Sequence, residues 1–192
     1  MLSVKTATNK ATRIITYTNP PRDYLNAEGC SQLLAAFTEA LEDDDVRAVI
    51  ITGDGEAFIR HYDVRDIIAV GEAVRAGGTQ PEDFEKGPFA DLIKAIMGAP
   101  KPVISAINGV CMGGGFELAL ACDLRVTQSD VSHIGLPETR INIFPGGGGT
   151  QQLPRLIGEA RALEFVLLGR TVSAQVGKDM GLVHQGGGHA PE

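Results

Sequence analysis

The 192-residue sequence contains no tryptophan, few aromatic residues (5%) and only three cysteines. The cysteines are an odd number, lie among apolar neighbours and form no Cys-x-x-Cys pair, so we interpret Cys30, Cys111 and Cys122 as reduced core residues. No apolar run has the length that a bilayer requires, and residues 1–5 lack a signal-peptide hydrophobic stretch. We therefore expect a cytoplasmic protein with no membrane association and no bound metal.

Positive charge is also scarce, because 17 Lys and Arg residues stand against 24 Asp and Glu residues, for a formal net charge of −7. Nucleic acids and anionic membranes attract basic surfaces, so neither is expected as a partner. Any anionic ligand would need locally clustered cations. With 43% apolar and 21% charged residues, the composition is that of a folded chain, and the length suits one domain with a well-buried core.

Hydrophobic periodicity alternates between strand-like and helix-like segments, which is typical of an α/β fold. Asn26 is expected to cap the first helix, whose apolar stripe runs from Cys30 to Leu41. The other predicted elements are strands at Ile14–Thr18, Ala48–Thr52, Val103–Ile107 and Leu124–Thr127, helices at Val64–Val70, Pro88–Met97, Phe116–Ala121 and Glu159–Leu168, and a glycine-rich loop at Ile143–Gly149. The stretch Gly77–Pro81 is expected to be mobile. Residues 1–185 are expected to form the core domain and residues 186–192 a disordered tail.

The abundant glycines, 24 in number, first suggest a nucleotide site, but the usual motifs are absent. No stretch fits Gly-x-Gly-x-x-Gly, and Gly177-Lys178 is followed by Asp179 rather than Ser or Thr. Gly-x-Ser-x-Gly and His-Glu-x-x-His are also absent, which removes the common serine hydrolases and zinc peptidases. What remains is a combination of glycines with carboxylates.

The segment Gly113-Gly114-Gly115 ends a predicted strand and opens a helix. Unpaired N–H groups at such a corner can hold an oxyanion, although a tight turn with close helix packing explains the triplet equally well. Glu117 follows among apolar residues that would raise its pKa, and Glu138 comes 21 residues later, after another strand. Two carboxyl groups at one end of a sheet could share a water and divide acid and base roles, whereas the plainer interpretations are a helix-start acid and a loop glutamate.

Together these residues resemble the enoyl-CoA hydratase/isomerase, or crotonase, family over nearly the whole chain. The resemblance begins at Asn19-Pro20-Pro21-Arg22 and is most specific from Lys101 to Asp123, with further blocks at Leu136-Pro137-Glu138 and Pro145–Gln151. It implies a spiral of stacked ββα units, assembled as a trimer or hexamer, that binds acyl-CoA thioesters.

By this resemblance, the backbone N–H groups of Gly114 and Tyr62 form an oxyanion hole for the thioester oxygen. Glu117 and Glu138 would position the water that adds to a 2-enoyl-CoA to give a 3-hydroxyacyl-CoA. The reaction would need no cofactor, since CoA enters as part of the substrate. The open alternatives are a Δ3-Δ2-enoyl-CoA isomerase or another thioester-enolate enzyme, which can work with one acid, and a catalytically inert CoA-binding or RNA-binding relative.

The sequence departs from the family pattern in two places. Where the family has a small-Ala-Gly-small-Asp segment, this chain has the bulkier Phe58-Ile59-Arg60-His61-Tyr62-Asp63. If His61 takes the glycine position, we expect a strained or rearranged backbone and a displaced Tyr62 donor. His61 is a secondary candidate for substrate binding or a third catalytic role. Arg22, Arg60 and Arg65 are the candidates for neutralising the CoA phosphates. The C-terminal helical segment that most relatives carry after the position of Val183 is missing, which predicts an exposed apolar patch.

Overall fold

The computed structural model describes residues 1–78, 80 and 86–186. One sheet has six strands in the order β1-β2-β3-β5-β7-β10, parallel except for the β1–β2 hairpin. Its strands are β1 (Ser3–Asn9), β2 (Thr12–Thr18), β3 (Ala48–Gly53), β5 (Val103–Ile107), β7 (Leu124–Thr127) and β10 (Gln185–Gly186). Inward-facing residues of β2, β3 and β5 alternate with half-buried ones, as expected for strands packed by helices.

A second sheet of four short strands has the order β4-β6-β8-β9. The strands are β4 (Ala57–Ile59), β6 (Val110–Met112), β8 (Ile134–Gly135) and β9 (Thr171–Val172), parallel except for β8–β9. Along the chain, β3, β5 and β7 each leave the large sheet and are followed by β4, β6 and β8 in the small one. Each turn of the chain thus contributes one strand to each sheet before a helix, which is the expected spiral of ββα units.

Asn108 stabilises the corner at which two successive turns pass from one sheet to the other. Its Oδ1 accepts the Gly53 N–H at 3.0 Å, and its Nδ2 donates to the Gly55 carbonyl at 2.9 Å. The corner after β5 is therefore fastened to the corner after β3, and the strands that follow, β4 and β6, begin side by side.

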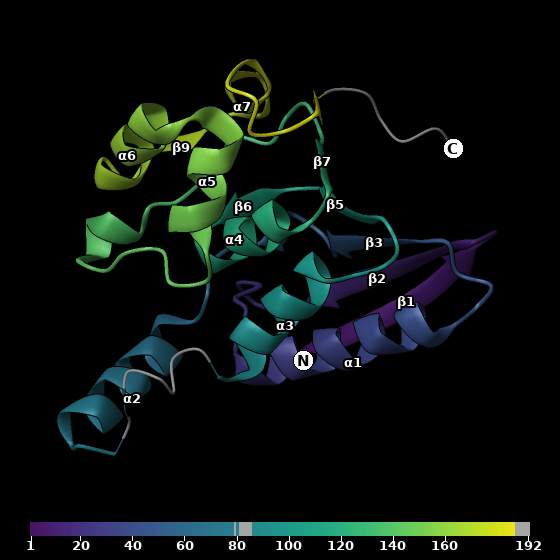
Figure 1. The fold of residues 1–192 in the computed structure, drawn as a ribbon, viewed down its shortest axis with the longest axis horizontal. Helices are drawn as coiled ribbons and strands as arrows, with labels where there is room; N and C mark the ends of the chain where they lie inside the picture. The colour runs from purple at the N-terminus through teal and green to yellow at the C-terminus, as the bar shows by residue number, and fades with distance from the viewer. Residues whose placement is uncertain (79, 81–85, 187–192) are drawn as a thin grey trace.

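The helices cover the sheets (Figure 1). Helices α1 and α3 pack together against the large sheet, α4 lies between the sheets and α5, and α2 extends away from the body (Figure 1). The bounds are α1 (Ala27–Glu42), α2 (Val64–Arg75), α3 (Pro88–Met97), α4 (Gly114–Ala121), the 3₁₀ helix η2 (Glu138–Ile141), α5 (Gly149–Ile157), α6 (Glu159–Leu167) and α7 (Ala174–Asp179).

Several predicted elements have the bounds that the sequence indicated, including β5, β7 and α3. Asn26 caps α1 by accepting the Gly29 N–H at 2.8 Å. Helix α2 continues five residues beyond the predicted end at Val70, and α5 directly follows the glycine-rich loop. Residue 79 and residue 81 of the stretch expected to be mobile lie outside the described residues, as do residues 187–192 of the expected tail, whereas Gly186 belongs to β10.

The core contains all three cysteines, which are buried and free of disulfides as predicted. Burial raises the pKa of the Cys30 and Cys122 thiols to about 12, so neither is a thiolate at neutral pH. No helix within the described part of the chain is long and apolar enough to cross a membrane.

Candidate active site

A cavity of about 490 Å³ lies where the small sheet, α2, α3 and η2 meet, and five of the predicted site residues line it. These are His61, Tyr62, Gly114 and the pair Glu117 and Glu138, which come from three separate turns of the spiral. The remaining walls are mostly apolar and are made by Asp66, Ile67, Val70, Gly71, Phe89, Asn142, Ile143, Phe144, Gly146 and Gly147. The size and the few convergent polar groups suit a small organic substrate.

The glycine triplet begins α4, and each of its residues lacks a side chain for a local reason. Gly113 has φ +52° and packs against the His61 ring, and a Cβ on Gly115 would overlap the backbone carbonyl of Ile59. A Cβ on Gly114 would lie 3.0 Å from the Tyr62 Cβ and 3.5 Å from its backbone nitrogen. The triplet therefore allows close packing of α4 and also leaves the backbone of Gly114 accessible from the cavity. Both interpretations of the triplet, a tightly packed helix start and a backbone site for an oxyanion, are compatible with this arrangement.

Two peptide N–H groups beside this contact have no acceptor in the part of the chain that the structure describes. Residues 61–63 pair with Leu25 through the His61 carbonyl and the Asp63 N–H, which leaves the Tyr62 N–H without an acceptor among the described residues. The Gly114 N–H, at the first position of α4, likewise has none in this part of the chain. Both amides follow β4 and β6, which are neighbouring parallel strands, so two free donors lie side by side at the cavity.

Glu117 is 4% exposed and is held by the glycine-rich loop. Its Oε1 accepts the N–H groups of Gly147 at 2.7 Å and Gly149 at 2.8 Å. Burial raises the pKa of Glu117 to about 7, and the two N–H donors oppose this rise only in part. Glu117 is therefore not simply a helix-start acid: it is fixed in place and able to gain or lose a proton near neutral pH.

Glu138 is 3% exposed, and its Oε2 has no hydrogen-bond partner among the described residues. Burial, followed by the negative charge of Glu117, raises its pKa to about 8. The two acids thus interact electrostatically across one cavity, and burial raises the pKa of both toward the range in which a carboxyl group can gain or lose a proton near neutral pH. An unpaired buried carboxyl oxygen is costly unless a ligand or water binds it.

The expected strain at His61 is not found. The non-glycine residues with positive φ in the described chain are Lys10, Asp23 and Asn142, so His61 keeps an ordinary backbone. The reason is that residues 61–63 continue in extended pairing with Leu25. The His61 ring instead occupies space above Gly113, and its Nδ1 lies 2.8 Å from the Tyr62 carbonyl oxygen.

The predicted arginines lie around a neighbouring cavity of about 450 Å³, which Arg22 and Arg65 line together with Asn19, Pro20, Pro21, Tyr24, Asp63 and Val64. Arg65 is paired with Asp63 through Nη2 and Nε, an interaction that lowers the pKa of Asp63. Arg60 does not line this cavity but donates from Nε to the Arg22 carbonyl at 3.1 Å. One chain segment borders both cavities: His61, Tyr62, Asp66 and Ile67 line the first, and residues 63–65 line the second.

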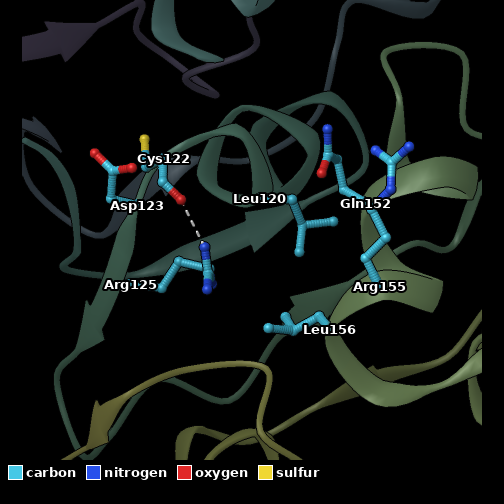
Figure 2. A pocket seen from close by; sticks show the side chains of 7 residues that line it. All are labelled: Leu120, Cys122, Asp123, Arg125, Gln152, Arg155 and Leu156. Atoms are coloured by element: carbon cyan, nitrogen blue, oxygen red, sulfur yellow. Dashed lines mark hydrogen bonds between the residues drawn. The ribbon is translucent and has the colours of Figure 1, made fainter. Parts of the chain in front are cut away.

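A third cavity, of about 200 Å³, lies apart from these residues between α4, β7 and α5, as Figure 2 shows. Arg125 lies at one side of it and donates to the Cys122 carbonyl at 2.8 Å (Figure 2). It also donates to the Leu182 carbonyl at 3.0 Å. These bonds fasten β7 to the end of α4 and to the chain before β10, which is a structural role. Within the described residues, no group of three or more His, Cys, Asp or Glu side chains is placed to hold a metal ion.

Sequence reasoning missed the residues that hold the acids in place. Gly147 and Gly149 were expected only as part of a loop, yet their N–H groups orient Glu117. Asp66 also lines the cavity and accepts the Ala27 N–H at 3.1 Å. The density of glycines at 146–149 was the available signal, but the contact partner 30 residues away could not be read from it.

Residues 7–186 match the sequence profile of the enoyl-CoA hydratase/isomerase family. The chain belongs to this family. Among its relatives, the Bacillus subtilis protein YngF, named as an enoyl-CoA hydratase/isomerase, is 41% identical over 181 residues, which cover 93% of this chain and 66% of the relative. A peroxisomal fatty acid beta-oxidation multifunctional protein of Arabidopsis thaliana is 37% identical over 172 residues, covering 88% of this chain and 23% of that protein.

Solved structures within the enoyl-CoA hydratase/isomerase family have the same fold. An enoyl-CoA hydratase from Bacillus anthracis is 35% identical, with a TM-score of 0.79, and the match covers 96% of this chain and 69% of that one. The predicted α/β spiral is thereby confirmed. This chain spans about two thirds of the length of YngF and of this hydratase.

Proposed function

We propose that this chain is an enoyl-CoA hydratase, which adds water across the 2,3 double bond of a 2-enoyl-CoA to give a 3-hydroxyacyl-CoA. The observation that carries the proposal is the cavity itself, in which two buried acids with raised pKa values face two unpaired backbone N–H groups. A hydratase needs this combination, because it must activate water and also stabilise a negative oxygen.

In the proposed reaction, the N–H groups of Tyr62 and Gly114 donate to the thioester oxygen. Water attacking C3 pushes the double-bond electrons toward this oxygen, and the fixed donors favour the resulting enolate. One such donor contributes about 3–4 kcal/mol to the transition state. Because both donors are backbone groups, the bulky side chain of Tyr62 does not alter the donor itself.

The two acids divide the proton transfers. One of them, as carboxylate, removes a proton from the attacking water, and the other delivers a proton to C2. The total number of protons on the pair is unchanged, and transfer of a proton from the first acid to the second restores the starting state. Glu117 keeps a fixed orientation through Gly147 and Gly149, while the unpaired Oε2 of Glu138 is free to bind the water. The reaction consumes no cofactor, since CoA is part of the substrate, and requires no metal.

The neighbouring cavity suits the nucleotide end of CoA. Arg22 and Arg65 line it, and Arg60 holds the Arg22 backbone, so guanidinium groups are available to the phosphates of an otherwise acidic protein. The shared segment at residues 61–65 lets one ligand reach from the acids to these arginines.

Assembly into a trimer or hexamer and a cytoplasmic location belong to the same proposal. Leu163, Leu167 and Leu168 on and after α6 are 56–62% exposed, and Phe144 is 70% exposed, which suits a surface covered by another subunit or segment. The three buried thiols suit a reducing compartment. Light scattering coupled to size exclusion gives the mass of the assembly directly.

The test of the function is hydration of crotonyl-CoA, measured as the decrease in absorbance when its conjugated double bond is lost. Both Glu117→Gln and Glu138→Gln should lower kcat by about a hundredfold or more, in keeping with general acid–base catalysis. Glu159→Gln is the matched control, because Glu159 is an exposed acid in the first turn of α6. Loss on only one substitution, with double-bond migration retained, would identify an isomerase instead. Binding of CoA without turnover would identify an inert relative, and calorimetric titration with RNA tests the RNA-binding alternative.

A further inference from the structure

The imidazole of His61 lies beside the N–H groups of Tyr62 and Gly114. One of its two nitrogens, Nε2, has no hydrogen-bond partner among the described residues. Its Cδ2 and Nε2 atoms are each 2.5 Å from the point where a Cβ on Gly113 would lie, so this ring edge covers the residue just before Gly114. No partner for Nε2 is found in the described ranges, and the residue lines the cavity. The ring edge carrying Nε2 therefore stands next to the proposed oxyanion site.

The other ring nitrogen fixes the orientation of the imidazole. Nδ1 lies 2.8 Å from the Tyr62 carbonyl oxygen, and a carbonyl oxygen can only accept, so Nδ1 carries a hydrogen in both the neutral and the charged ring. A second proton can therefore enter only at Nε2. The positively charged ring would then present an Nε2–H donor from a fixed position.

Acidic side chains surround this ring. The ionisable groups that line it within the described residues are Tyr62, Asp66 from α2, Glu117 from α4 and Glu138 from η2, besides His61. Of the other charged groups on the same segment, Asp63 is paired with Arg65, and Arg60 donates to the Arg22 carbonyl. Among the described lining residues, His61 is thus the one whose side chain can carry a positive charge, and it lies in the same cavity as the three acids.

We propose that His61, as the imidazolium, is a third donor of the oxyanion site and hydrogen-bonds through Nε2–H to the enolate oxygen. This inference rests on the proposed function. No proton is transferred in this role: the imidazolium keeps both N–H bonds while the oxygen gains and then loses negative charge. The family pattern has backbone donors beside small residues, so the side-chain donor would be a property of this chain.

The experiment compares wild type with His61→Ala, His61→Gln and the control His133→Gln, which removes an exposed imidazole bonded to Ser132. Acetoacetyl-CoA is the probe, because its enolate absorbs where its keto form does not. We expect His61→Ala to lower the bound enolate fraction and to lower kcat for crotonyl-CoA by about tenfold to a hundredfold, with a smaller change in KM. His61→Gln keeps a neutral donor, so its bound enolate fraction and its kcat should lie between those of wild type and His61→Ala.

Proton NMR of the wild type provides a readout that does not depend on a variant folding. The chain has four histidines, and the His61 ring signal is assigned by its loss in His61→Gln. Binding of acetoacetyl-CoA should raise the pKa of His61, since an enolate oxygen at Nε2 favours the imidazolium. An unchanged His61 pKa on binding, or wild-type kcat and enolate absorbance in His61→Ala, overturns the third donor while leaving the hydratase intact. If wild type neither binds acetoacetyl-CoA nor hydrates crotonyl-CoA, the proposed function itself fails.

Discussion

Replacing Glu117 by glutamine should stabilise the fold above neutral pH and remove activity. Burial raises the pKa of Glu117 from its ordinary value of 4.5 to about 7, so between these values the folded chain binds more protons than the unfolded chain. The free energy of unfolding therefore falls as the pH rises through this window. The whole shift corresponds to about 3 kcal/mol, which is lost above neutral pH.

Glu117→Gln keeps an oxygen that can accept from Gly147 and Gly149 but carries no charge. At pH 4, where the carboxyl is mostly protonated in both states, the variant and wild type should have similar free energies of unfolding. At pH 9 the variant should be more stable by about 3 kcal/mol. Loss of the Glu117 charge also lowers the pKa of Glu138, which adds to the difference in the same direction.

Urea denaturation at a series of pH values measures this difference directly, with Glu159→Gln as the exposed control whose effect should stay near zero throughout. A gain in stability that is equal at pH 4 and pH 9 would falsify the assignment of a buried, proton-binding carboxyl. A loss of stability that grows with pH would contradict it still more directly, because it would mean that the charged form is the favoured one.

Three further substitutions probe single contacts. Gly113→Ala places a side chain at φ +52° against the His61 ring, so it should lower both thermal stability and kcat, and combining it with His61→Ala should restore part of the loss. Phe89→Ala opens the wall beside Gly114, where the Phe89 ring contacts that of Tyr62 at a centroid distance of 5.2 Å, and should shift kcat/KM toward longer or branched acyl chains; an unchanged chain-length profile would contradict a specificity role. Asn26→Ala removes the α1 cap and should cost about 1 kcal/mol in urea denaturation without changing kcat.

The strands and helices that could be predicted from the sequence are those whose own residues carry the signal. Val103–Ile107 is a β-branched and apolar run between a proline and an Asn-Gly pair, and the Pro88–Met97 helix begins with proline and carries a clear apolar stripe. The strand Ser3–Asn9, by contrast, is largely exposed and polar, so no periodicity marks it. It exists because it pairs with β2, a contact between segments rather than a property of one.

The candidate site divides in the same way. Glu117 and Glu138 could be singled out because a carboxyl in an apolar segment is chemically unusual, and the structure brings both to one cavity. The attachment of Glu117 to Gly147 and Gly149, and the seat of the His61 ring over Gly113, could not be predicted. These contacts join different turns of the spiral, and their geometry follows from how the turns stack.

The parallel pairing of β4 with β6 also bears on which side-chain substitutions the candidate site can accept. Adjacent strands in a sheet are about 4.8 Å apart whatever side chains they carry. Tyr62 lies three residues beyond β4 and Gly114 two residues beyond β6, so the position of each N–H group depends first on where the main chain leaves these strands. Under the proposed function, side chains around position 62 can therefore be exchanged to alter which acyl groups bind while both backbone N–H donors are kept. These surrounding positions are accordingly targets for redesign of substrate preference.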